Sequence, residues 1–189
     1  MGLFFYTLLV SAAYIVALPF LLLYSFKTKH RIALPARFFL RNNPPFNKEG
    51  VWFHACSLGE VNSLKPIFAQ FQDKNINLSV ITATGYKEAK KIQGVHVRFL
   101  PFEIFLPFWV KKNQTLVVTE AELWPMLFIV AKAKGAKTLL INARISDNSY
   151  GAYKRFSLVY RWIFSYVDEV LAQSEKDKKR LEELGAKNV

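Results

Sequence analysis

The longest apolar run in the sequence lies at its amino terminus. Residues 3–26 read LFFYTLLVSAAYIVALPFLLLYSF and contain no charged side chain. A helix rises about 1.5 Å per residue, so a helix over this run would be long enough to cross the roughly 30 Å hydrocarbon core of a membrane. We therefore predict a membrane-anchoring helix over residues 1–26. Whether it crosses the bilayer or lies at an angle stays open, because Pro19 inside the run favours a kink.

A basic segment follows the apolar run. Its cationic side chains are Lys27, Lys29, His30, Arg31, Arg37 and Arg41. Such a collar favours the cytoplasmic side of a membrane, beside anionic headgroups. A cleaved signal peptide is the alternative, but no basic residue precedes the run and no small-x-small site ends it. Residues 42–50, NNPPFNKEG, are rich in turn-forming residues and predict a linker. Residues 27–50 are therefore predicted to form the basic collar and the linker that follows it.

After residue 50 short apolar runs alternate with helical periodicity. The runs predict strands at 51–56, 78–83, 95–100, 115–119, 138–142 and 168–172. Helical patterns cover 60–72, 85–92, 103–112, 124–134, 150–166 and 175–184. Continuous apolar strands suit a parallel sheet that is covered on both faces. The alternation predicts a doubly wound, Rossmann-like α/β domain over residues 51–189.

Ligands of such sheets bind outside the carboxyl ends of the strands, so the segments after the strands are the candidate site. Five of them are polar, namely SLGE, TATGYKEA, TEAELWP, NARIS and AQSEKD. The third strand instead ends in LPFE, where Pro101 breaks it. TATGYKEA resembles a phosphate-binding turn, but its single glycine matches neither a P-loop nor GxGxxG. In AQSEKD, Ser174 and Asp177 fit a capping box.

Glu60 follows a turn of small residues, Ser57 to Gly59, at the start of a predicted helix. The simple interpretation is that its charge complements the helix dipole, which contributes about 0.3–1 kcal/mol. The functional interpretation is a general base that takes a proton from a substrate hydroxyl at the mouth of the sheet. Position alone leaves both open.

Two acids follow the fourth predicted strand, and an arginine follows the fifth. Glu120 and Glu122 lie two residues apart before Trp124, and Arg144 follows the fifth strand. Arginine suits a carboxylate or a phosphate because its planar fork binds two oxygens. An ion pair between Arg144 and one of the glutamates is the competing interpretation, and both can hold.

Composition narrows the class of partner. Apolar residues make up 52% of the chain, which excludes disorder, and the net charge of +12 favours anionic partners. The single cysteine excludes an internal disulfide framework, and the three histidines lack metal-site spacing, so no metal or cofactor is expected. The segment GAYKRFSLVYRW, residues 151–162, alternates basic and aromatic residues. It predicts either an amphipathic helix with a core face or a surface for lipid headgroups, and the anchor favours lipid over nucleic acid.

The motifs FHACSLGE, TATGYKEA, LPFE, TEAELWP, INARIS and AQSEKD stand in the order and spacing of the 3-deoxy-D-manno-octulosonic acid (Kdo) transferase family. The sequence resembles the N-terminal half of such an enzyme from its anchor to Val189, and TEAELWP followed by NARIS is the specific part. The resemblance implies the first of two Rossmann-like domains of an inverting, metal-independent GT-B glycosyltransferase. It further implies transfer of Kdo from CMP-Kdo to a lipid A precursor in lipopolysaccharide synthesis, at the cytoplasmic face of the inner membrane of a Gram-negative bacterium.

The resemblance also implies roles for single residues. The glutamate of the family's S-x-G-E turn falls on Glu60, as the general base, and the first glutamate of E-x-E-L-W-P falls on Glu120, in transition-state stabilisation. We expect acceptor contacts from the remaining polar residues of this edge. They are Ser57, Gly59, Thr84, Glu122 and Arg144. Expected partners are the lipid A precursor, CMP-Kdo and inner-membrane phospholipids, without nucleic acid.

Two departures and two alternatives accompany the resemblance. The sequence ends at LGAKNV, where the second domain of the family begins, so most donor contacts are expected beyond Val189 and these residues alone are not expected to catalyse transfer. The collar reads PARFFLRNN where relatives often carry a Gly-Glu-Arg type of stretch. Another membrane-bound GT-B transferase is one alternative, although the glycine-rich loops of the peptidoglycan enzyme are absent. A non-catalytic, anchored module that binds anionic lipid is the other, and its binding would be indifferent to Glu60 and Glu120.

Overall fold

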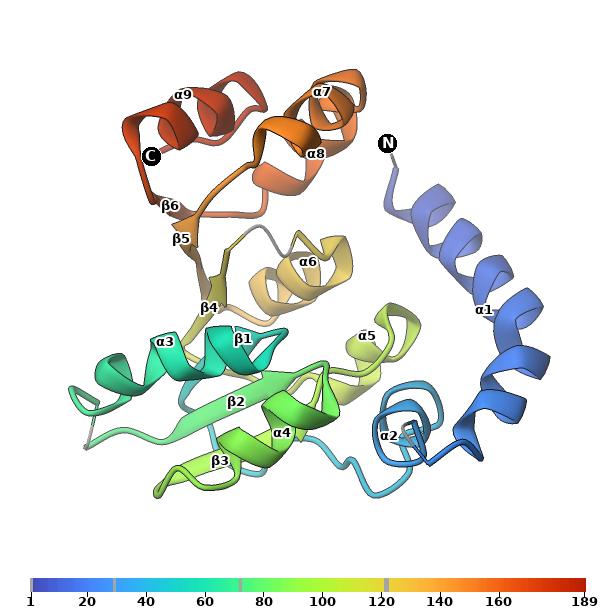
Figure 1. Cartoon of the computed structure of the whole chain (residues 1–189). Helices are drawn as coiled ribbons and strands as arrows, with labels where there is room; N and C mark the ends of the chain where they lie inside the picture. Colours follow the sequence, from blue (N-terminus) through green and yellow to red (C-terminus); the bar gives the residue numbers. More distant parts are fainter. Residues whose placement is uncertain (1, 29, 72, 121–122) are drawn as a thin grey trace.

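The computed structural model describes residues 2–28, 30–71, 73–120 and 123–189. Within these residues six strands form one sheet in the order β3-β2-β1-β4-β5-β6, with every neighbouring pair parallel (Figure 1). The strands are β1 (Val51–Ala55), β2 (Ile76–Val80), β3 (Val95–Phe99), β4 (Thr115–Thr119), β5 (Lys137–Ala143) and β6 (Glu169–Ala172). The predicted Rossmann-like α/β fold and its N-terminal apolar helix are confirmed.

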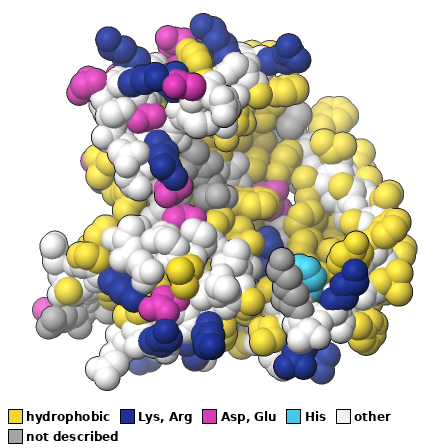
Figure 2. Space-filling view, viewed as in Figure 1, with side chains coloured by type: hydrophobic (Ala, Val, Ile, Leu, Met, Phe, Trp, Pro, Cys, Tyr) yellow, Lys and Arg dark blue, Asp and Glu magenta, His cyan; other side chains and the backbone are white. Residues whose placement is uncertain are grey.

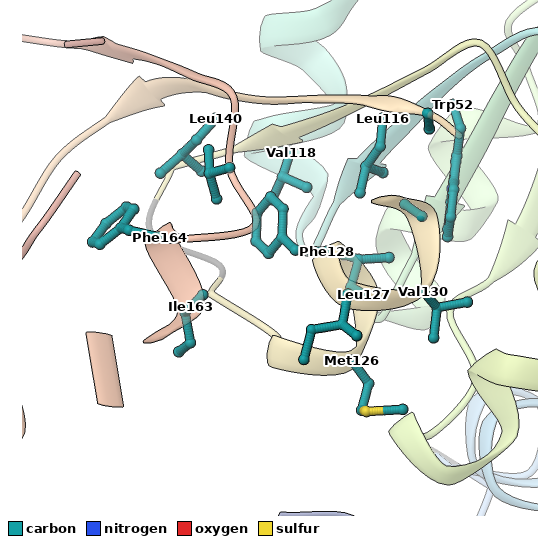
Figure 3. Packing of buried hydrophobic residues seen from close by; sticks show 14 of the residues in the cluster. Trp52, Leu116, Val118, Met126, Leu127, Phe128, Val130, Leu140, Ile163 and Phe164 are labelled. Atoms are coloured by element: carbon teal, nitrogen blue, oxygen red, sulfur yellow. The ribbon is translucent and has the colours of Figure 1, made fainter. Parts of the chain in front are cut away.

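Helices cover both faces of the sheet, because side chains alternate along each strand. Phe53 of β1 packs on the face that α3 (Leu58–Phe68) and α4 (Ala83–Ala89) cover. Trp52 packs on the opposite face, in the buried layer that also contains residues of α6 (Pro125–Ala133) and α8 (Ser157–Phe164). Figure 3 shows this second layer, in which Phe128 of α6 lies beside Val118 of β4 and Phe164 of α8 lies nearer Leu140 of β5. The two buried layers fix the sheet, and with it the positions of the loops at its carboxyl edge.

Apart from shifted helix ends, the structure differs from the predicted helices in three places. The helix predicted over 103–112 is a 3-10 turn, η1 (Glu103–Phe105), followed by the short α5 (Leu106–Trp109). The helix predicted over 150–166 is two helices, α7 (Asp147–Arg155) and α8, separated at Phe156. A short helix that the pattern did not predict, α2 (Ala33–Phe38), lies within the basic collar. The last helix, α9 (Glu175–Glu183), matches its predicted range to within one residue.

The N-terminal helix α1 (Leu3–Ser25) is long and apolar enough to cross a membrane, by length and composition. It runs beside the domain rather than away from it (Figure 1). The Tyr6 hydroxyl donates to the carboxylate of Glu103, which also accepts the backbone N–H of Met126 at 2.9 Å. Glu103 is 4% exposed, and burial raises the pKa of its carboxyl group, against the effect of these two donors. Tyr14 donates to the carbonyl of Phe38 at 2.7 Å, so α1 is fastened at two levels.

The predicted linker lacks helix and strand, yet part of it packs into the domain. Asn43 and Phe46 are 2% and 4% exposed. The Asn43 amide bonds both backbone groups of Phe99, donating to the carbonyl at 2.9 Å and accepting the N–H at 3.1 Å. Arg37 Nε donates to the carbonyl of Leu100 at 3.0 Å. The collar is therefore held against the carboxyl end of β3.

Candidate active site

The strand order reverses direction between β1 and β4, which are hydrogen-bonded neighbours. The connections after β1 run toward β3, and those after β4 run toward β6, so the segments that follow the two strands leave in opposite directions. In doubly wound sheets this reversal opens a crevice at the carboxyl ends of the two strands. The segment from Cys56 to Glu60 leaves β1 here, and Glu120 leaves β4. The fold thus brings the two predicted catalytic glutamates to the position where doubly wound sheets bind ligands.

Glu60 belongs to a complete capping box at the start of α3. Ser57 is the N-cap residue and its Oγ accepts the Glu60 N–H at 3.4 Å. In return the Glu60 carboxylate accepts the backbone N–H groups of Ser57 at 3.1 Å and Cys56 at 2.8 Å. The helix begins at Leu58, two residues earlier than predicted, because the cap lies at Ser57. Glu60 therefore lies in the first turn of α3, where its charge also complements the helix dipole, and this position leaves a catalytic role open.

Two hydroxyl groups complete the surroundings of the Glu60 carboxylate. Ser57 Oγ lies 2.8 Å from Oε1, and Thr119 Oγ1, at the end of β4, lies 2.7 Å from Oε2. Thr119 Oγ1 also lies 3.1 Å from the His54 carbonyl, so the shorter contact takes the hydroxyl proton. Four donors fix the direction of the carboxylate, and Glu60 as a residue is 6% exposed. A substrate hydroxyl can reach it only by replacing a donor, and Ser57 Oγ is the donor that side-chain rotation alone can move away.

Glu120 has a left-handed backbone with φ of 58°, which is uncommon for a residue with a side chain and is often found at functional sites. Its N–H donates to the Ile141 carbonyl of the neighbouring β5 at 2.9 Å. Its carboxylate pairs with Arg144 across 3.1 Å, which confirms the ion pair considered from the sequence. Both side chains keep exposed surface, 31% for Glu120 and 57% for Arg144. Glu122 lies outside the described residues.

The remaining predicted site residues lie at the same edge. Gly59 is in the first turn of α3 rather than in a turn before it, and the nearest atom to an added Cβ would be Ser57 Oγ at 3.8 Å. This leaves open space above the helix start. Thr84 is exposed in the first turn of α4, whose Gly85 approaches the Ser57 backbone so closely that a Cβ would lie 3.3 Å away. The edge therefore carries Ser57, Gly59 and Thr84 side by side.

Thr119 and His54 are site neighbours that the sequence did not single out. Thr119 is 2% exposed. The sequence feature that could have pointed to it is a polar residue at the end of an apolar strand, directly before Glu120. His54 is fully buried and its Nδ1 lies 2.9 Å from Ser79 Oγ. Burial lowers the pKa of His54 to about 3, so its ring is neutral at ordinary pH. His54 therefore supports the β1 end without offering acid–base chemistry.

A cavity of about 550 Å³ opens beside Glu120 and Arg144, lined also by residues of α7 and α9. Its wall is built by ion pairs in which Asp147 meets Lys176 at 2.6 Å and also meets Arg180. Hydrogen bonds from these two cations lower the pKa of Asp147 to about 2. The cavity is polar and adjoins the crevice, so a charged ligand can extend from Glu120 toward β6.

Comparison of the sequence with known proteins identifies the family of the chain. The family described as "3-Deoxy-D-manno-octulosonic-acid transferase (kdotransferase)" matches residues 28–189. A 3-deoxy-D-manno-octulosonic acid transferase of Chlamydia pneumoniae is 35% identical, over 96% of this chain and 44% of its own length. The transferase of Haemophilus influenzae is 29% identical, over 96% of this chain and 45% of its own length. A bifunctional glycosyltransferase/methyltransferase of Fusobacterium nucleatum is 33% identical, over 74% of this chain and 24% of its own length.

The chain spans less than half the length of these relatives. The family match nevertheless covers most of it, including the capping box at Glu60, the Glu120–Arg144 pair and the whole sheet. The chain belongs to the Kdo transferase family of glycosyltransferases.

Proposed function

We propose that this chain forms the acceptor-binding half of an inverting, metal-independent Kdo transferase that moves Kdo from CMP-Kdo to a lipid A precursor. The observation that carries the proposal is the Glu60 carboxylate at the reversal point between β1 and β4, with Thr119 and Ser57 donating to its two oxygens. The donor nucleotide would be bound mainly by residues after Val189.

In the proposed reaction the acceptor hydroxyl replaces the Ser57 hydroxyl at Glu60 Oε1. Its oxygen attacks the anomeric carbon of Kdo, and the bond from that carbon to the CMP phosphate oxygen breaks. The bonding electrons leave with CMP on the opposite face, and the hydroxyl proton passes to Glu60. A positioned base of this kind typically accelerates such a step by about 10²–10⁴-fold. Thr119 and the Cys56 N–H hold the other carboxylate oxygen still while the proton moves.

Glu120 and Arg144 act on the charge of the donor sugar. The transition state for loss of CMP carries positive charge on the sugar ring, which the exposed carboxylate of Glu120 would stabilise. Arg144 would bind the carboxylate of Kdo or the phosphate of CMP through its planar fork. Their ion pair, at 3.1 Å, holds both groups in place before the substrate arrives. Ser57, Gly59, Thr84 and the undescribed Glu122 complete the proposed acceptor surface.

A membrane location fits the acceptor lipid. The apolar α1 and the net charge of +12 support attachment of the domain to an anionic membrane. We place it at the cytoplasmic face of the inner membrane. The contacts from Tyr6 to Glu103 and from Tyr14 to Phe38 hold the helix against the domain, so attachment by α1 also sets the distance of the sheet edge from the lipid surface.

The test uses the protein at its full natural length, in detergent, with a lipid A precursor and CMP-Kdo. Mass spectrometry of the lipid is expected to show one or more added Kdo units, and NMR of the product is expected to show inversion at the anomeric carbon. Lipid binding by a folded protein without any gain in mass would contradict the proposed transfer and favour the binding module. Transfer that persists after complete removal of divalent cations would support metal independence, and transfer lost with them would contradict it.

A further inference from the structure

A groove of about 770 Å³ lies where the end of α1 meets α2 and the carboxyl end of β3. Most of its lining is apolar or aromatic. These side chains include Leu22, Phe26, Ile32, Phe39, Tyr86 and Phe99. Two guanidinium groups, those of Arg31 and Arg41, line the same groove. Apolar walls combined with two cations suit a ligand that has both an apolar chain and an anionic group.

The turn that carries Arg41 is held in a defined shape. Leu40 and Asn42, on either side of it, both have a left-handed backbone with φ of 53°. Such a conformation is uncommon for a leucine and persists where surrounding contacts enforce it. Here the contacts are made by Asn43, the residue after Asn42, whose side-chain amide bonds both backbone groups of Phe99. The Arg41 side chain therefore extends from a fixed base, which reduces the cost of ordering it around a ligand.

The two arginines carry charge that the described part of the chain does not neutralise. Both residues are exposed, and none of the ion pairs between described residues includes either of them. Figure 2 shows Lys and Arg side chains gathered where the end of α1 meets α2, next to the apolar surface of α1. An anion at the groove would be attracted by both guanidinium groups.

We propose that this groove binds one anionic phospholipid, with its phosphate between Arg31 and Arg41 and an acyl chain along Leu22 and Phe26. The groove lies beside the exposed apolar end of α1, and this position favours a phospholipid as the ligand. One wall is the last turns of α1, where Leu22 is 47% and Phe26 is 84% exposed. A helix this apolar is surrounded by lipid chains at a membrane, and basic pockets beside such helices bind anionic headgroups. The bound lipid would fix how the domain is tilted, since the collar is fastened to β3 by Asn43.

The experiment needs no sugar transfer, so its outcome is independent of the proposed function. The purified, delipidated protein is titrated in uncharged detergent with phosphatidylglycerol or phosphatidylcholine, and bound lipid is counted by native mass spectrometry. We expect one phosphatidylglycerol per chain, bound at least about tenfold more tightly than phosphatidylcholine. The double variant Arg31→Gln/Arg41→Gln is expected to lose this preference. The control Lys111→Gln/Lys179→Gln removes two exposed charges elsewhere and is expected to retain it.

Four results would overturn the proposal. The double variant could retain the preference for phosphatidylglycerol, or phosphatidylcholine could bind equally well. Inorganic phosphate could displace the lipid at equal concentration, which would make the groove a site for phosphate alone. A phosphorylated glycolipid acceptor could bind more tightly than phosphatidylglycerol and lose that advantage in the double variant, which would make the groove an acceptor subsite. Circular dichroism and unfolding midpoints of all variants confirm that any loss of binding comes from the arginines.

Discussion

Replacing Thr119 with valine tests whether the β4 hydroxyl stabilises the Glu60 carboxylate. Valine keeps the shape of the side chain and removes its hydroxyl group. Thr119 is 2% exposed and its Oγ1 lies 2.7 Å from Glu60 Oε2, so water is not expected to replace the lost donor. The carboxylate would keep Cys56 N–H, Ser57 N–H and Ser57 Oγ. The variant isolates one contact between the β1 and β4 ends of the crevice.

The expected loss can be estimated from the kind of bond. A hydrogen bond to a charged group typically contributes about 1.5–3 kcal/mol, and removing one partner leaves the buried group undersolvated. For a protein of this size a loss of 1 kcal/mol lowers the unfolding midpoint by about 2–4 °C, so a decrease of about 3–12 °C is expected. Thr119→Ser keeps the donor and loses one methyl group, which is expected to cost only about 1 kcal/mol.

The free energy of unfolding is measured by urea titration in detergent, with thermal unfolding as a second readout. Thr115→Val, at the start of the same strand, is the matched control, because the Thr115 hydroxyl makes no hydrogen bond among those found in the described residues. Thr119→Val is expected to be clearly less stable than Thr119→Ser and Thr115→Val. If Thr119→Val unfolds within about 0.5 kcal/mol of the wild type, the hydroxyl does not support the carboxylate and the reasoning fails.

Two further predictions concern the anchor helix and a buried histidine. Tyr6→Phe leaves the buried Glu103 with the Met126 N–H as its remaining donor among the described residues. α1 should therefore loosen by about 1.5–3 kcal/mol, and its first turns should exchange amide hydrogens faster; unchanged exchange would contradict this. Since burial lowers the pKa of His54 from 6.5 to about 3, the unfolded chain binds a proton below pH 6.5 that the folded chain does not. The free energy of unfolding should therefore decrease as the pH is lowered from about 6.5 toward about 3, by up to about 1.4 kcal/mol per pH unit. His54→Gln should flatten this dependence in urea titrations, and an equal slope in the variant would refute the lowered pKa of His54.

The strands were predictable because each is a short apolar run, and the central strands β1, β2 and β4 are buried on both faces. β4 matches its predicted range, 115–119, and β2 begins two residues earlier than predicted. The early start is explained by Asn77, a residue that disfavours strands but is buried here, with its amide donating to Asn113 at 2.9 Å. Asn113 lies 36 residues after Asn77, so the local sequence around Asn77 does not reveal this hydrogen bond.

The break between α7 and α8 and the helix α2 depend in the same way on tertiary contacts. Residues on both sides of Phe156 have helical periodicity, and after the break Ile163 and Phe164 are buried in the same cluster as α6. α2 has six residues including Pro35, too few to be stable alone, and it is held by bonds from Arg37 and Asn43 to the end of β3.

The candidate site was partly predictable, since the carboxyl ends of parallel strands meet at one edge. Glu60, Glu120 and Arg144 followed from that rule. Thr119 did not, because a threonine at the end of an apolar strand is common and its role depends on α3 lying across the crevice. The left-handed backbone of Glu120 likewise has no sequence signal, since glutamate does not favour it.

The most direct measurement compares the initial rate of Kdo transfer by Glu60→Gln with that of the wild type, in the protein at its full natural length. Glu182→Gln, an exposed change on α9, is the control for charge. Because the glutamine amide would face donors, the unfolding midpoint of each variant is measured alongside the rate. We expect Glu60→Gln to remain folded and to transfer Kdo at least about 100-fold more slowly, while Glu182→Gln keeps the wild-type rate. A folded Glu60→Gln protein that transfers Kdo within about threefold of the wild-type rate would show that Glu60 is a helix cap and not the base.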